Sequence, residues 1–148
     1  MPGKGLCIGL RALAIFAVSL SLTSSWAATN WNEKVLHNFG SGADGNYPPA
    51  GLIRDAAGNL YGTTLYGGAH NYGTVFELSA SAGGGWTETV SHSFGNGVDG
   101  VFPFAGLTFD AAGDLYGTTY LGGTYDEGTV FELTPVNPCA TCSHANLR

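Results

Sequence analysis

Residues 31–78 recur as residues 86–133, in an ungapped register of 55 positions (86 minus 31). The two copies are identical at 30 of 48 aligned positions, and the shared residues are mostly glycines, threonines, aromatics and turn-forming aspartates. Because such residues specify backbone shape, the copies are expected to share one conformation. Each copy predicts a single supersecondary unit that needs neighbours to bury its apolar side chains.

The second copy predicts a series of short antiparallel strands. Large side chains alternate with Thr and Ser over residues 86–94, which is the period of a half-buried strand. The chain is expected to turn after residue 94, because residues 95–100 are rich in glycine and Pro103 lacks an amide donor. Residues 105–109 and 115–121 then form a hairpin over the turn DAAGD, with Asp110 capping it and Gly113 left-handed. Residues 128–134 supply the last strand.

An all-β fold of two tandem four-stranded repeats follows, because no segment keeps helical spacing before glycine interrupts it. Four-stranded units at this period are typical of β-propeller blades. Two blades cannot enclose a channel, since closed propellers have about four to eight. The chain is therefore a truncated array, a protomer that completes a ring by self-association, or an eight-stranded sandwich or barrel. The repeats are expected at residues 31–85 and 86–134, within a domain at 28–134 and before an irregular tail at 135–148.

The N-terminal segment is typical of a secretory signal peptide. Lys4 and Arg11 precede an uncharged apolar run at residues 12–22, and the small residues Ser25 and Ala27 suit signal peptidase. The run is about half the roughly 20 residues of a spanning helix, so a retained membrane anchor is the weaker alternative. We expect residues 1–27 to be removed and the protein to be secreted, periplasmic or displayed on the cell surface.

The charge of the remaining chain argues against nucleic acid as a partner. Removal of residues 1–27 leaves three basic residues (5 minus 2) against eleven acidic ones, a formal charge of −8. Lys34, Arg54 and Arg148 are far apart in the sequence. Neutralising phosphates requires clustered Lys and Arg, which this chain lacks.

The motifs GNLYGTT, GDLYGTT and the twice-occurring GTVFEL resemble those of a bacterial family, the choice-of-anchor tandem repeat GloVer-containing proteins. The resemblance covers both copies. In the first copy it rests on Phe39, Asp44, Gly45, Pro48, Ala50, Gly51, Leu52, Asp55, Gly58, Leu60, Tyr61, Gly62, Thr63, Thr64, Gly67, Gly68, Gly73, Thr74, Val75 and Phe76. The family implies export and surface display of propeller-like repeats, without an established activity or catalytic residues. Its members usually carry more repeats and often a C-terminal sorting signal, from which this chain departs.

Duplicated carboxylates raise the question of glycoside hydrolysis, which uses one acid as proton donor and another as base or nucleophile. Glu33 recurs as Glu88, and Glu77 recurs as Glu132. A single reacting bond requires one asymmetric group of residues, so identical copies favour structural roles. The duplicated histidines, His37 and His92, share a strand face with apolar side chains and are interpreted as hydrogen-bonded core residues.

Aspartates offer oxygen ligands that calcium accepts, but their spacing matches no EF-hand loop. Aspartate beside glycine also suits turns for backbone reasons alone. We therefore predict no cofactor and no metal site, with calcium as the one cation these residues suit. The residues concerned are Asp44, Asp55, Asp99, Asp110 and Asp114.

The tail contains Cys139, Cys142 and His144. Two cysteines and one histidine do not fill a tetrahedral zinc site. A disulfide between the two cysteines is the favoured interpretation in an oxidising compartment, and a tail without a role is the alternative.

Positions at which the copies differ are the candidates for recognition, because binding loops vary while scaffold positions repeat. One variable loop reads His70-Asn71-Tyr72 where the other copy has Tyr125-Asp126-Glu127, and Tyr47 becomes Phe102. Exposed aromatic rings on rigid loops would stack on sugar rings or bind a protein. The alternative is neutral sequence variation, which surface loops tolerate. The candidate binding residues are His70, Asn71, Tyr72, Tyr125, Asp126, Glu127, Tyr47 and Phe102.

The sequence as a whole favours an exported, non-enzymatic β-repeat protein that acts as a structural or binding module. The expected partner is an extracellular ligand, either a glycan or a protein, and further copies of the chain would complete the repeat array. A carbohydrate-active enzyme fragment or a sugar-binding module is the alternative.

Overall fold

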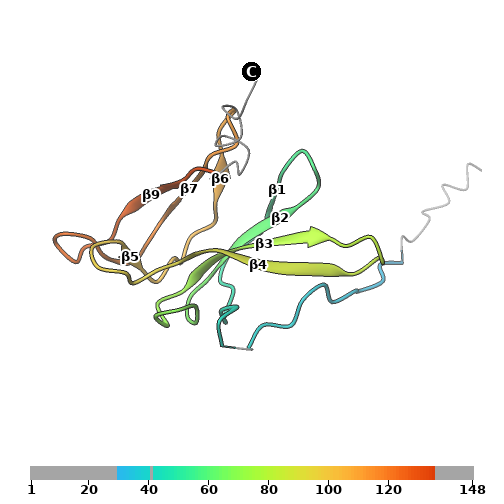
Figure 1. The fold of residues 1–148 in the computed structure, drawn as a ribbon, viewed down its shortest axis with the longest axis horizontal. Coiled ribbons are helices and arrows are strands. Elements are labelled where there is room, and N and C mark those ends of the chain that lie inside the picture. Colours follow the sequence, from blue (N-terminus) through green and yellow to red (C-terminus); the bar gives the residue numbers. More distant parts are fainter. Residues whose placement is uncertain (1–29, 41, 136–148) are drawn as a thin grey trace, which may run out of the picture. The chain divides into compact units, whose positions relative to one another are not determined.

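The computed structural model describes residues 30–40 and 42–135 (Figure 1). The chain divides into two units, Met1–Glu33 and Lys34–Arg148, and every strand lies in the second. The predicted signal peptide and the residues Cys139, Cys142 and His144 lie outside the described residues. Within the described ranges no helix could cross a membrane.

In the part of the chain that the structure describes, nine strands, all paired antiparallel, make up the regular structure and no helix is formed. The predicted all-β class is confirmed, although the described residues show neither a closed barrel nor a propeller. The strands are β1 (Ile53–Arg54), β2 (Leu60–Thr64), β3 (Thr74–Ala80), β4 (Trp86–Ser93), β5 (Gly100–Val101), β6 (Thr108–Phe109), β7 (Leu115–Thr118), β8 (Leu121–Gly122) and β9 (Val130–Leu133).

The first sheet has the order β1-β2-β3-β4, so its last strand comes from the second copy (Figure 1). This corrects the expectation that each copy builds its own four-stranded sheet. The pairing places Val75 opposite His92 and Glu77 opposite Thr89, with a bulge between Val75 and Phe76. Val75 and Phe76 are fully buried in β3, and a strand buried this deeply requires partners for its backbone groups on both edges.

The second sheet, β6-β7-β9, contains the counterparts of β1-β2-β3. The predicted hairpin is confirmed, with Phe109 opposite Leu115. Asp110 Oδ1 accepts the amides of Ala112, Gly113 and Asp114 at 2.8, 2.9 and 2.9 Å. Gly113 has the expected left-handed backbone, with φ of 93°. Local side-chain hydrogen bonds therefore fix the turn as the sequence predicts.

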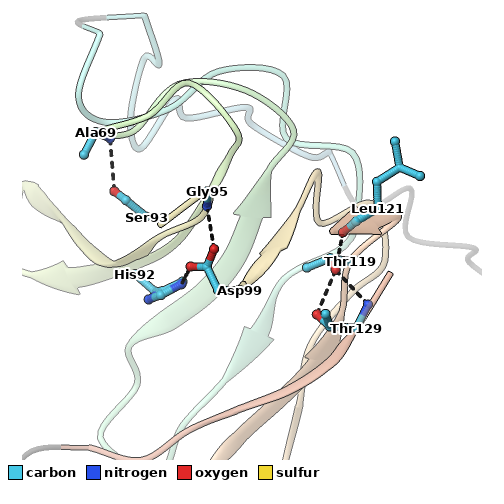
Figure 2. A network of polar contacts seen from close by, with 8 residues as sticks. All are labelled: Ala69, His92, Ser93, Gly95, Asp99, Thr119, Leu121 and Thr129. Atoms are coloured by element: carbon cyan, nitrogen blue, oxygen red, sulfur yellow. Dashed lines mark hydrogen bonds and ion pairs between the residues drawn. The ribbon is translucent and has the colours of Figure 1, made fainter. Parts of the chain in front are cut away.

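The predicted strand at residues 115–121 is divided into β7 and β8, and β8 pairs with β5 in a separate two-stranded sheet. Thr119 lies between them. Its Oγ1 donates to the carbonyl of Leu121 at 3.0 Å and accepts the amide of Thr129 at 3.0 Å (Figure 2). A hydroxyl thus satisfies backbone groups where the regular ladder ends.

The hydrophobic core joins the two copies. Val75 of the first copy packs in one buried cluster with Phe94, Leu107 and Leu115 of the second. Along β4 half-buried side chains alternate with exposed ones, as the sequence predicts. After β4, the ring of Phe94 meets that of Phe131 edge-on, with centroids 5.0 Å apart. The chain segment at β4 therefore extends the first sheet and anchors the second.

Candidate functional site

Aromatic rings from loops of both copies lie edge to face in one chain of contacts. Ring centroids are 5.9 Å apart between Tyr47 and Tyr66, 5.6 Å between Tyr66 and Phe102, and 5.5 Å between Phe102 and Tyr72. Edge-to-face packing at such distances is favourable for aromatic pairs. We call these four residues the aromatic cluster.

Two members of the aromatic cluster have a left-handed backbone. Tyr47 has φ of 54°, and its counterpart Phe102 has φ of 59°. Bulky residues rarely adopt this conformation, which costs about 1–3 kcal/mol and must be held by surrounding contacts. The carbonyl of Tyr47 accepts the amide of Leu65 at 3.0 Å, and the carbonyl of Phe102 accepts that of Tyr120 at 3.0 Å.

Phe102 also links the two copies, because its amide donates to the carbonyl of Tyr72 at 2.9 Å. The same pair of residues therefore joins the copies through the backbone and through ring packing. This backbone hydrogen bond holds Phe102 beside Tyr72.

The variable loops contain two more left-handed residues, Asn71 with φ of 61° and Asp126 with φ of 58°. Here the side chain compensates. Asn71 Oδ1 accepts the amide of Gly67 at 3.0 Å, and Asp126 Oδ1 accepts that of Gly122 at 3.0 Å. Asn and Asp tolerate this conformation because their short polar side chains bond locally. The described non-glycine residues with a left-handed backbone are Tyr47, Asn71, Phe102 and Asp126. Each of them is predicted from the sequence as a candidate binding residue.

A pocket of about 380 Å³ lies beside the aromatic cluster. It contains two cluster members, Tyr66 and Phe102, and its walls are mostly apolar. Phe104 and Tyr120, which are 63% and 69% exposed, lie on its rim. The complete lining is Leu65, Tyr66, Phe102, Phe104, Tyr120 and Leu121. Concave apolar surfaces with a few polar groups are the usual form of small-ligand sites.

Five candidate binding residues are brought to this region, namely Tyr47, Tyr72, Phe102, Asp126 and Glu127. Tyr72, Phe102 and Asp126 line one further hollow of about 500 Å³. Glu127 lines another, of about 490 Å³, together with Phe104 and Tyr120. His70 and Asn71 are exposed on the same loop as Tyr72, and Tyr125 is 87% exposed.

Sequence reasoning missed Tyr66 and Tyr120, which line the pocket of about 380 Å³ from opposite copies. A signal was present, because Leu65-Tyr66 in the first copy becomes Tyr120-Leu121 in the second. The transposed pair places both tyrosines beside Phe102.

The duplicated histidines are hydrogen-bonded, as predicted, each to an aspartate, but they are not part of the buried core cluster. His37 Nε2 lies 3.2 Å from Asp44 Oδ2, and His92 Nε2 lies 3.1 Å from Asp99 Oδ2. Figure 2 shows that Asp99 also accepts the amide of Gly95, at 2.9 Å. Both histidines are half-buried, with 21% and 31% of the side chain exposed. The pairs tie the end of β4 at His92, and the corresponding segment at His37, to the glycine-rich loop that follows each of them.

Among the duplicated glutamates, Glu88 has a perturbed environment. Desolvation raises its pKa above the ordinary value, His37 lowers it and Asp44 raises it again. Glu88 Oε1 is buried without a hydrogen-bond partner among the described residues. Its counterpart Glu33 is exposed, so the two copies are not equivalent here.

The turn aspartates are used for backbone capping. Burial tends to raise the pKa of Asp55, but hydrogen bonds from Asn59, Gly58 and Tyr61 lower it below the ordinary value overall. The pKa of Asp110 is likewise lowered, first by the amide of Asp114. Across residues 30–40 and 42–135, no three His, Cys, Asp or Glu side chains gather as a metal site would require.

Antiparallel sheets that share strands between successive copies, with aromatic loops at the junction, define a β-repeat protein. The sequence model of a protein family, the Gloeobacter/Verrucomicrobia repeat, matches residues 21–146. The chain belongs to this GloVer repeat family, which confirms the resemblance drawn from its motifs. Neither a curated protein nor a solved structure matches it.

Proposed function

We propose that the chain is an exported, non-enzymatic binding module whose ligand lies in the pocket of about 380 Å³ beside the aromatic cluster. One observation carries the proposal: two bulky residues of the aromatic cluster, Tyr47 and Phe102, are held in left-handed backbone conformations, and Phe102 meets Tyr66 and Tyr72 of the other copy. Backbone strain of this kind clusters at ligand sites, where surrounding contacts maintain it.

A glycan is the ligand class that suits the pocket best. Tyrosine combines a flat apolar face, which covers a sugar ring, with a hydroxyl that bonds to polar groups at its edge. Tyr66 and Tyr120 offer two such faces across the pocket, and both are exposed to solvent. Export, as expected from the N-terminal segment, would bring the module into contact with extracellular polysaccharides.

A glycan array probed with the full chain tests the ligand class. We expect saturable binding that is lost when Tyr66→Ala and Tyr120→Ala are combined, because both pocket faces disappear. Val98→Ala is the control, since Val98 is 77% exposed and does not line this pocket. Failure to bind any glycan, or equal binding by the double variant and the wild type, contradicts the proposal.

A carbohydrate-active enzyme is the second candidate, favoured by Glu88. Desolvation and the neighbouring Asp44 raise its pKa, which is the direction of shift that the general acid of glycoside hydrolysis requires. Hydrolysis assays on every glycan bound by the chain separate the two functions. Turnover that disappears in Glu88→Gln supports the enzyme, whereas binding without turnover supports the module.

A further inference from the structure

The contact between the two copies provides a template for a contact between two chains. β4 of the second copy is the outer strand on β3 of the first, and Leu107 of the second copy shares a buried cluster with Val75 of the first. We call the edge of β3 that β4 covers an acceptor edge, and the covering strand, here β4, a donor strand. Each copy contains the sequence of both.

The second copy has an acceptor edge that carries no donor strand in the described part of the chain. β9 is the counterpart of β3, and its only partner there is β7. Val130 is 80% exposed, whereas its counterpart Val75 is 0% exposed. The position that the donor strand and its copy cover at Val75 is therefore open at Val130.

The first copy has the matching donor strand. Residues 31–38 are the counterparts of β4, yet they form no strand in the part of the chain that the structure describes. Trp31 is 91% exposed and Val35 is 59% exposed. Leu52, the counterpart of Leu107, is 48% exposed where Leu107 is 7% exposed. Apolar side chains that are covered in the second copy are therefore open in the first.

We propose that residues 31–38 of one chain pair with β9 of a second copy and form its outer strand. The 55-residue register fixes the pairing, because Phe76 opposite Val90 becomes Phe131 opposite Val35. Strand addition at an exposed sheet edge satisfies backbone groups through new hydrogen bonds and seats alternate side chains on the sheet. The contact is head to tail and does not depend on the proposed ligand.

The pairing between two chains gains a charge interaction that the β3–β4 pairing within one chain lacks. Within the chain, Glu77 lies opposite the neutral Thr89. In the same register between chains, Glu132 lies opposite Lys34, and opposite charges placed across antiparallel strands attract. In the single chain the Nζ of Lys34 donates to the exposed carbonyl of Gly84 at 3.1 Å, a bond that the carboxylate of Glu132 would replace.

The end of the donor strand already has the conformation of the template. The rings of His37 and Phe39 have centroids 4.6 Å apart at 81°, and those of His92 and Phe94 have the same values. Phe39 meets Phe76 at 4.9 Å, as Phe94 meets Phe131 at 5.0 Å. The ring contacts that hold Phe39 against its own copy therefore match those that hold Phe94. Residues 31–36 precede this anchor in the first copy as β4 precedes it in the second.

A head-to-tail contact of this kind repeats from chain to chain and produces a ring if it closes, or a filament if it does not. Each chain supplies two blade-like sheets. Closed propellers contain about four to eight, which corresponds to rings of about two to four chains.

Sedimentation velocity of the full chain over a concentration series tests the contact. We expect the sedimenting mass to rise with concentration to a multiple of the chain. Val130→Asp places a charge on the open edge and should abolish this rise, whereas Val98→Asp should not. Val98 is the matched control because it is 77% exposed in the loop after Phe94. Thermal unfolding checks that both variants fold.

The charge pair tests the register. Lys34→Glu and Glu132→Lys should each weaken association about tenfold, because attraction across the strands becomes repulsion. The double variant should restore it. A chain that stays monomeric at every soluble concentration overturns the proposal. So does association that is insensitive to Val130→Asp, or single charge variants that the double variant does not rescue.

Discussion

Val75 and Val130 occupy the same position in the two copies, 55 residues apart, yet Val75 is 0% exposed and Val130 is 80% exposed. The sequence around them is identical, GTVFEL in both copies. Only their neighbours differ, since β4 covers β3 and no described strand covers that edge of β9. Burial in this fold is therefore set by what the next copy contributes.

Truncating these two valines should have unequal effects. Val75→Ala removes two buried methyl groups and leaves a cavity, so we expect a loss of about 2–3 kcal/mol in the free energy of unfolding. Val130→Ala should change it by less than about 0.5 kcal/mol. Denaturant unfolding at low protein concentration, where the chain is monomeric, measures both. Equal losses would show that β9 is covered as fully as β3.

Local features of the fold could be predicted from the sequence because the residues that form them are neighbours. The turn at Asp110 depends on amides within four positions, and the half-buried character of β4 depends on alternation alone. The partner of β4 could not be predicted in this way. Alternation shows that one face is buried but does not show which sheet edge the strand joins, and β4 joins the preceding copy.

In the candidate site, too, the features set by neighbouring residues could be predicted and those set by distant contacts could not. Asn71 and Asp126 are residue types that favour a left-handed backbone, so their loops could be recognised. Tyr47 and Phe102 have the same conformation although bulky residues rarely adopt it and the proline that follows each of them favours an extended backbone. Long-range contacts determine it, such as the bond from Phe102 to the carbonyl of Tyr72, and no pattern within either copy encodes them.

Replacing Gly62 is expected to destabilise the fold, because β2 lies close to the side chains of Leu52 and Phe76 at this position. A Cβ at this position would lie 2.7 Å from Leu52 Cδ2 and 2.7 Å from Phe76 Cζ. Since Phe76 is buried and cannot withdraw, Gly62→Ala should cost about 1–3 kcal/mol. Gly83→Ala is the control, because a Cβ there meets nothing within 4 Å. Thermal unfolding should separate the two variants, and equal melting temperatures would refute the close approach.

Asp110 should make stability depend on pH in the acidic range. Its folded-state pKa lies below the ordinary 3.8, so the ionised carboxylate stabilises the fold above that value. The contribution is lost as pH falls through the folded-state pKa, because protonation removes the charge that the three turn amides favour. Asp110→Asn should therefore be less stable than the wild type near neutral pH, and the gap should narrow below about pH 3.8. A gap in melting temperature that stays constant with pH would contradict this assignment.

Asn71 should be replaceable by glycine at a lower cost than by alanine. Alanine loses the bond from Asn71 Oδ1 to the amide of Gly67 and is strained at φ of 61°, so Asn71→Ala should cost about 1.5–3 kcal/mol. Asn71→Gly loses the same bond without the strain and should cost about 1 kcal/mol less. Denaturant unfolding of the pair, together with the glycine and alanine variants of Asp126, measures the difference in both copies. If alanine is tolerated as well as glycine, the loop does not hold these residues in the left-handed conformation.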